Sequence, residues 1–317
     1  MLCKVSWGKV FGTTGKLSKL SKLRILIFAA LISALLSGCL VDKKKVDKIS
    51  RSTDTLRIYQ AGDVIEYNIN ATTSNNVTGN TTQYGTMRIE WANTASITDP
   101  ISGGEIFPDL KETTTITYDG STQPDAIVVR YISQINTAPA VGSDDPGIGS
   151  IILHAIHDQL GADYWPYIDG TVPPNSPVIT PVIFESPLMV GNISPQAFSI
   201  MECGTSQCNN EIYQFSDGVV NTVGDSKEID TGLGVFTNPF EVSYSGGIIP
   251  VGAQALSFLG DIRDACGTSA DRITHSGTMF VMPEIGIVQM TNQCTNLEPG
   301  GDIIFYNIEA TNTSFTF

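Results

Sequence analysis

Residues 62–72 read GDVIEYNINAT, and apolar and polar side chains alternate along most of this stretch. Alternation with a period of two is typical of a β-strand with one face in a core and the other in water. Similar runs recur as TMRIEW at 86–91, ETTTITY at 112–118 and AIVVRYIS at 126–133. The 30 glycines and 16 prolines of the chain supply turns between such runs. The pattern predicts an antiparallel all-β protein.

A second copy of the opening stretch lies near the end of the chain. Residues 301–311 read GDIIFYNIEAT, and eight of the eleven positions are identical to those of 62–72. The tripeptide GTM also recurs, after the first copy at 85–87 and before the second copy at 277–279. An internal duplication into two related sub-domains and convergence between strand sequences both explain this likeness, and both stay open.

Two short helices are expected between the strands. Residues 150–160 read SIILHAIHDQL, and a weaker candidate, AQALSFLGDIRDA, lies at 253–265. On a helix, His154 and Asp158 share one face and His157 lies next to them. These side chains are a candidate metal cluster without a further ligand, and an ordinary surface pair of His and Asp is the alternative.

The N-terminal residues have the pattern of an export signal. Residues 1–38 contain six Lys or Arg and no Asp or Glu, and an apolar run, ILIFAALISALL, fills 25–36. The sequence Leu-Ser-Gly-Cys at 36–39 resembles the lipobox of bacterial lipoproteins. The resemblance implies that 1–38 is a lipoprotein signal peptide that is removed, and that Cys39 becomes the acylated first residue. An uncleaved membrane helix over 25–41 is the alternative, although 17 residues barely span a bilayer.

The residue after the cysteine bears on localisation. The bacterial lipoproteins that this N-terminus resembles follow a sorting rule. In that rule, Asp directly after the lipidated Cys retains the protein in the inner membrane. Leu40 stands at that position. The resemblance therefore implies a bacterial outer-membrane protein whose partner is the membrane itself, reached through the N-terminal lipid.

The charge of the chain disfavours nucleic acid as a partner. From residue 39 onward the chain contains 12 Lys and Arg and 32 Asp and Glu, which gives a net charge of −20. A surface this acidic repels phosphate. Five of the remaining twelve cations lie in residues 39–53, which we interpret as a flexible tether close to the lipid headgroups or, equally, as a solubilising linker.

We expect an N-terminal β sub-domain at 54–138, a loop and helix connection at 139–176 and a C-terminal β sub-domain at 177–317.

Four cysteines remain beyond Cys39. An even number of cysteines in an exported protein predicts two disulfides, and four cysteines allow three pairings. We favour Cys203–Cys208, which closes the short loop CGTSQC, together with Cys266–Cys294. A zinc site is the alternative, but the C-x4-C spacing fits zinc poorly.

The C-terminal half carries a second resemblance. KEIDTGLGVFTNPFEVSYSG at 227–246, GTMFVMPEIGIVQM at 277–290 and GDIIFYNIEA at 301–310 loosely resemble segments of uncharacterised periplasmic lipoproteins. The resemblance implies a strongly curved antiparallel sheet or an open or half barrel with one concave face. Ile65 replaces the tryptophan that the G-x-x-W-x-Y strand of these proteins usually carries. Their function is mostly unknown, so the resemblance implies a fold without implying chemistry.

Catalytic and cofactor motifs are missing from the sequence. It contains no G-x-S-x-G, G-x-G-x-x-G or H-E-x-x-H, and we predict no catalytic residue, no metal and no cofactor. We therefore expect a non-enzymatic binding or structural module of the envelope, with an envelope protein or a hydrophobic ligand as its partner. A carrier or sensor of a hydrophobic ligand in a concave β-face and an envelope-polymer hydrolase are the alternatives. Candidate ligand-binding residues are Trp91, Trp165 and Tyr167, with Tyr131, Tyr164, Phe184 and Phe280 as further aromatic side chains.

Overall fold

The fold comes from a computed structural model of the chain. The structure describes residues 48–75, 79–98, 104–139, 146–157, 163–168, 182–202, 210–225, 228–250, 273–296 and 302–317. All of them belong to the unit that runs from residue 47 to residue 317. The expected signal peptide, 1–38, and the expected helix at 253–265 lie outside the described residues.

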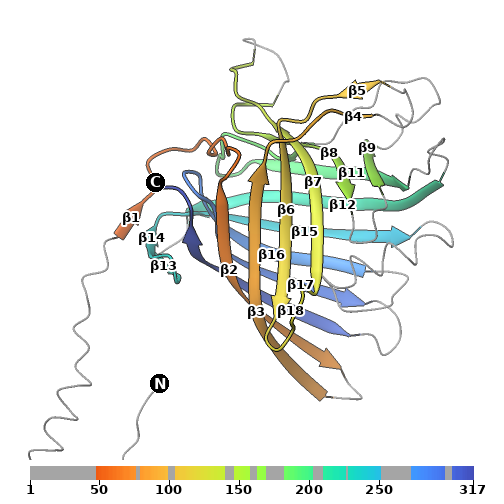
Figure 1. Cartoon of the computed structure of the whole chain (residues 1–317). Coiled ribbons are helices and arrows are strands. Elements are labelled where there is room, and N and C mark those ends of the chain that lie inside the picture. The colour runs from red at the N-terminus through yellow and green to blue at the C-terminus, as the bar shows by residue number, and fades with distance from the viewer. Residues whose placement is uncertain are drawn as a thin grey trace, which may run out of the picture. The chain divides into compact units, whose positions relative to one another are not determined.

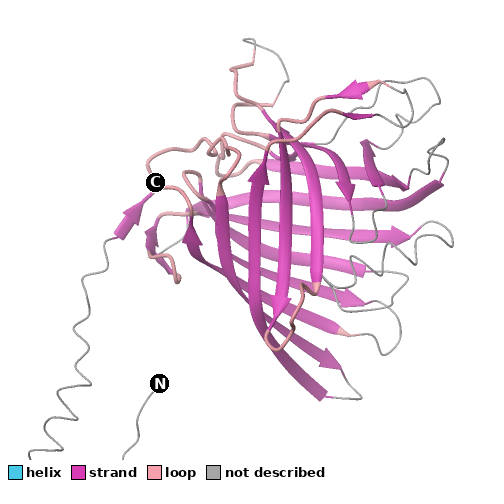
Figure 2. Cartoon of the chain, in the orientation of Figure 1, coloured by secondary structure: helices cyan, strands magenta, loops and turns pink. Residues whose placement is uncertain are grey.

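Every described element is a β-strand (Figure 2). The strands of the first half are β1 (Lys48–Ser50), β2 (Val64–Asn75), β3 (Gly79–Ala92), β4 (Ile97–Thr98), β5 (Glu105–Ile106), β6 (Leu110–Tyr118), β7 (Ala126–Gln134), β8 (Ile151–His157) and β9 (Asp163–Ile168). Those of the second half are β10 (Val182–Phe184), β11 (Ile193–Glu202), β12 (Asn210–Asp225), β13 (Glu228–Asp230), β14 (Val235–Thr237), β15 (Phe240–Pro250), β16 (Ile273–Met282), β17 (Gly286–Asn296) and β18 (Ile303–Thr313).

Thirteen strands form one large sheet in the order β10-β8-β7-β6-β3-β2-β18-β17-β16-β15-β12-β11-β9. All of its pairings are antiparallel, and β8 and β9 add a short pairing of two residue pairs. Figure 1 shows the strong curvature, with β2, β3, β6 and β7 running across the direction of β12, β15 and β17. The predicted all-β fold and curved antiparallel sheet are confirmed. Strands from 54–138 and from 177–317 lie in this same sheet.

The segment expected as a tether is ordered from Lys48 onward. Strand β1 pairs in parallel with β14, which also pairs with β13. The Glu284 carboxylate then accepts hydrogen bonds from the Ser52 hydroxyl, at 2.6 Å, and from the Thr53 backbone N–H, at 3.1 Å. The part of the expected flexible tether that the structure describes, residues 48–53, therefore belongs to the fold.

The two repeated stretches lie next to each other as β2 and β18. Their antiparallel register pairs Ile69 with Ile308, Tyr67 with Ala310 and Ala71 with Tyr306. Because Ile69 and Ile308 also occupy equivalent positions of the repeat, a local twofold axis passes through this pair. The GTM copies lie on β3, adjacent to β2, and on β16, which is not adjacent to β18, so they do not follow this symmetry.

The predicted helix at 150–160 is wrong, because Ile151–His157 is strand β8. Leu153 and Ala155 are buried and His154 between them is partly exposed, which is the burial pattern of a strand. The stretch is rich in β-branched isoleucine, and a short apolar run matches helix and strand equally well. The ladder that β8 forms with β7 decides between the two.

The inner face of the sheet carries the core. The larger cluster includes Ile65, Tyr67, Trp91, Phe236 and Met282, and a smaller cluster includes Leu56, Phe240 and Val281. Fully burying side chains of this size contributes about 1.5–3 kcal/mol each. The irregular segment before β2 joins this core, since Leu56 belongs to the smaller cluster and Tyr59 packs on the larger one.

Candidate functional site

The outward face of five neighbouring strands carries polar side chains in register. On β2 and β18 the buried residues Ile69 and Ile308 point inward, so the residues directly before and after each of them point outward. The pairing register aligns the outward residues in three rows that cross the strands. The rows are Thr86–Asn68–Glu309–Gln289, Tyr84–Asn70–Asn307–Thr291–Thr278 and Thr82–Thr72–Phe305–Gln293–Ser276.

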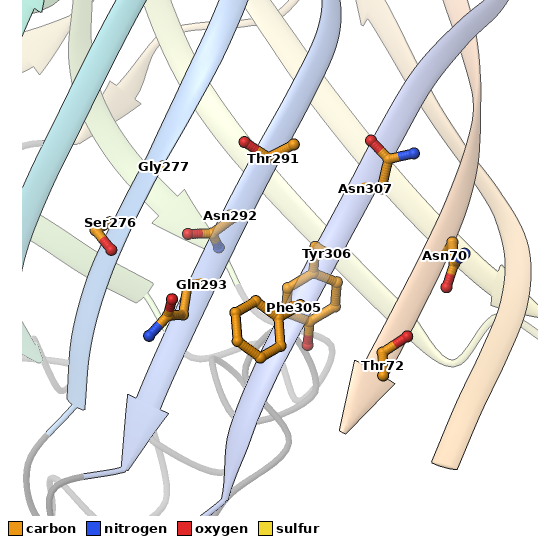
Figure 3. A pocket seen from close by; sticks show the side chains of 10 residues that line it. All are labelled: Asn70, Thr72, Ser276, Gly277, Thr291, Asn292, Gln293, Phe305, Tyr306 and Asn307. Atoms are coloured by element: carbon orange, nitrogen blue, oxygen red, sulfur yellow. The ribbon is translucent and has the colours of Figure 1, made fainter. Parts of the chain in front are cut away.

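Two open grooves lie on this face. The first has a volume of ≈ 390 Å³ and is lined by Asn70, Thr72, Ser276, Gly277, Thr291, Asn292, Gln293, Phe305, Tyr306 and Asn307 (Figure 3). The second has a volume of ≈ 470 Å³ and is lined by Asn68, Ile69, Asn70, Tyr84, Gly85, Thr86, Asp119, Asn307 and Glu309. Because Asn70 and Asn307 line both, we treat these residues together and call the site the outer groove.

Two aromatic side chains of the outer groove are strongly exposed. Tyr84 on β3 is 58% exposed and Phe305 on β18 is 46% exposed. They lie in adjacent rows on opposite sides of β2, and Figure 3 shows Phe305 beside Thr72 and Gln293. Exposed aromatic rings beside polar groups are typical of binding surfaces.

Hydrogen bonds within one strand and between neighbouring strands hold the polar groups in place. The Glu309 carboxylate accepts a bond from the Asn307 amide at 3.0 Å and another from the Gln289 amide at 3.1 Å. The hydroxyls of Thr72 and Thr82 lie 3.1 Å apart. The groups are therefore oriented before any ligand arrives, which lowers the entropic cost of binding.

The outer groove carries negative charge and no positive charge among its described lining residues. Asp119 and Glu309 supply its carboxylates. The nearest cation along the strand, Arg88, pairs with Glu90 and Glu66 beyond the groove. The remaining lining side chains are mainly amides and hydroxyls.

The predicted ligand residue Trp91 lies in the core. It is 3% exposed and stacks on Tyr59, with ring centroids 3.9 Å apart. Its indole N–H donates to Glu112 Oε2 at 3.2 Å, and Arg130 Nε donates to Glu112 Oε1 at 2.7 Å. Trp91 therefore joins the segment before β2 to the sheet and takes no part in the outer groove.

A glutamine completes this attachment. The Tyr59 backbone N–H donates to Gln134 Oε1 at 2.7 Å, and Gln134 Nε2 donates to the Arg57 carbonyl at 3.1 Å. Burial, and secondly the charge of Glu112, raise the pKa of the Tyr59 phenol well above its usual value. The phenol stays protonated and donates to the Ile285 carbonyl at 3.0 Å.

The other predicted site residues are placed only in part. Trp165 and Tyr167 lie on β9, whose side chains are not described, and β9 is not a neighbour of β3. Cys294 lies on β17 and is 1% exposed, whereas Cys39, Cys203, Cys208 and Cys266 lie outside the described residues. The two disulfides and the lipidation stay predictions.

The candidate metal cluster around His154 depended on a helix, but Ile151–His157 is strand β8. The side chain of His157 is not described, and Asp158 lies outside the described residues. His154 Nε2 instead lies 2.9 Å from Ser133 Oγ, and burial lowers its pKa. Among the residues that the structure describes, no group of three His, Cys, Asp or Glu is arranged to hold a metal.

The sequence analysis did not identify the residues of the outer groove, although each repeat contains several of them. Asn68 and Asn70 belong to the first copy, and Phe305, Asn307 and Glu309 belong to the second. The available signal was the polar half of the strand alternation, which marks the outward face. The pairing of β2 with β18, which joins the two sets, has no local sequence signal.

Comparisons with protein-family models, with curated proteins and with solved structures find no match to this chain. The described part of the chain contains no helix long and apolar enough to cross a membrane.

Proposed function

We propose that this chain is a lipid-anchored protein of the bacterial cell envelope, and that its β-unit is a non-enzymatic binding module. The anchor is Cys39, acylated after removal of 1–38 and directed to the outer membrane, as the Leu-Ser-Gly-Cys sequence and Leu40 imply. Two or more acyl chains make such attachment stable, because each buried CH₂ contributes about 0.8 kcal/mol.

The outer groove is the observation that supports a binding role. Its side chains are held by hydrogen bonds within β18 and between β17 and β18, and two aromatic rings are exposed beside them. The inner face carries the two core clusters, so the outward face suits a ligand better than the concave face does. This favours a surface-binding module over the carrier of a hydrophobic ligand.

The start of the folded unit fits attachment to a membrane. Lys48, where β1 starts, is nine positions after the proposed anchor at Cys39. Even a fully extended chain of this length reaches only about 30 Å. An anchored β-unit therefore stays close to the lipid surface, with ligands within reach in the envelope.

Membrane fractionation of cysteine variants tests the anchor. We expect Cys39→Ala to move the protein from the outer-membrane fraction to the soluble fraction or to leave it as an unprocessed precursor. Cys3→Ala is the matched control, because Cys3 lies in the same signal and outside the lipobox, and it should fractionate as the wild type does. Unchanged outer-membrane fractionation of Cys39→Ala would refute the anchor.

A further inference from the structure

The outer groove offers a ligand three kinds of group, and each restricts the class of ligand. Its neutral polar side chains are amides and hydroxyls, which both donate and accept hydrogen bonds. Its apolar contribution comes mainly from the exposed rings of Tyr84 and Phe305. Its charged groups are the carboxylates of Asp119 and Glu309. A suitable ligand therefore carries many hydroxyls, has apolar faces and lacks negative charge.

We propose that the outer groove binds a neutral glycan chain. This inference deepens the proposed function, on which it rests, by naming the ligand class. Sugar hydroxyls donate and accept as amide side chains do, and carboxylates accept hydrogen bonds from hydroxyls. The C–H faces of a sugar ring are apolar and pack on aromatic rings such as those of Tyr84 and Phe305.

The charge of the outer groove excludes an anionic polymer as its ligand. No Lys or Arg is among the described residues that line it, and two carboxylates are. A phosphate or uronate group placed there would be repelled and would lack a positive partner. The ligand is therefore a glycan built of uncharged sugars.

The shape of the outer groove suits a chain better than a single sugar. The two grooves are open and share Asn70 and Asn307, so they form one site across β3, β2, β18, β17 and β16. Five strands at about 4.8 Å spacing extend over roughly 19 Å, which accommodates several sugar units. Tyr84 and Phe305, in adjacent rows, are then stacking positions for different units.

A protein partner fits this surface less well. The centres of protein interfaces are enriched in aromatic residues, Met and Arg. The described lining of the outer groove contains no Met or Arg and is instead rich in Asn and Thr. The hydrogen bonds that Glu309 accepts from Asn307 and Gln289 also leave a rigid polar surface, which suits a ligand of many hydroxyls.

Affinity electrophoresis of the full-length protein in mild detergent tests this inference. Native gels contain dextran, glucomannan or xylan as neutral polymers, or polygalacturonate as an acidic polymer. We expect at least one neutral polymer to retard the protein and polygalacturonate to leave its mobility unchanged. Tyr84→Ala and Phe305→Ala should each weaken the retardation about tenfold, whereas Tyr84→Phe, which keeps the ring, should retain it.

Phe107→Ala is the matched control, since Phe107 is 70% exposed and lies outside the outer groove. Thermal unfolding of each variant checks that the fold is intact. The inference is overturned by no retardation in any neutral polymer, by stronger retardation in polygalacturonate or by undiminished binding in both alanine variants. Because the gels do not depend on the anchor, a negative result alongside a confirmed Cys39 anchor rejects the glycan and leaves the anchor standing.

Discussion

Glu112 contributes more to the stability of the fold than the glutamates on the surface do. It lies on β6, is 4% exposed and accepts hydrogen bonds from Trp91 and Arg130. We expect Glu112→Gln to lower the free energy of unfolding by about 2 kcal/mol, because the partly buried Arg130 loses its charged partner. Chemical denaturation measures the change.

Glu90→Gln is the matched control for this substitution. Glu90 pairs with Arg88, and both side chains are more than two-fifths exposed, at 43% and 47%. Surface ion pairs of this kind contribute about 0–1 kcal/mol. Equal losses of stability in Glu90→Gln and Glu112→Gln would contradict the role that we give to Glu112.

His154 makes the stability of the protein depend on pH. Burial lowers its pKa below the model-compound value of 6.5, so the unfolded chain binds a proton more readily than the folded chain. The contribution of this residue is complete above about pH 6.5 and is lost as the pH falls towards the folded-state pKa. We expect the wild type to lose more stability than His154→Gln between about pH 7.5 and about pH 5 in denaturant titrations. Parallel pH profiles would rule this out, because the carboxylates titrate in both proteins.

At the scale of the element, β3 and β6 approach each other closely at Gly85. A Cβ atom there would lie 2.4 Å from the Thr117 carbonyl oxygen and 2.8 Å from the Tyr118 Cα, which are both backbone atoms. We expect Gly85→Ala to separate the two strands and to lower the free energy of unfolding by about 1–3 kcal/mol. The melting temperature of the variant checks this, with Thr86→Ala on the exposed face as the control. A melting temperature equal to that of the control would show that the strands tolerate the added methyl group.

The strands could be predicted wherever one face is buried and the other is not. The alternation in 62–72 and in 301–311 gives β2 and β18 because Ile69 and Ile308 must point inward together. The run SIILHAIH, which contains β8, does not alternate clearly between apolar and polar residues. Its periodicity therefore does not distinguish a strand from a helix, and only pairing with β7 selects the strand. Trp91 was misjudged as a ligand residue for a related reason. Its stacking partner, Tyr59, lies in an irregular segment whose position no periodicity reveals.

At the scale of the whole molecule, the outer groove depends on the two ends of the unit lying side by side. Asn68 and Asn70 on β2 meet Asn307 and Glu309 on β18, and these strands are separated by most of the chain. Sequence spacing alone could not bring the two sets together. The anchor, by contrast, rests entirely on local sequence at 1–40, and only the nine positions from Cys39 to the start of β1 connect it to the fold.

The intact mass of the protein from detergent-extracted membranes tests the central claim of a lipid-anchored envelope module most directly. The account predicts a mass equal to residues 39–317 plus acyl chains, less four hydrogens for the two disulfides. Reduction should restore the four hydrogens and leave the acyl chains in place. A mass equal to that of the unmodified chain 1–317 would contradict the account, because it would mean an uncleaved N-terminal segment without a lipid.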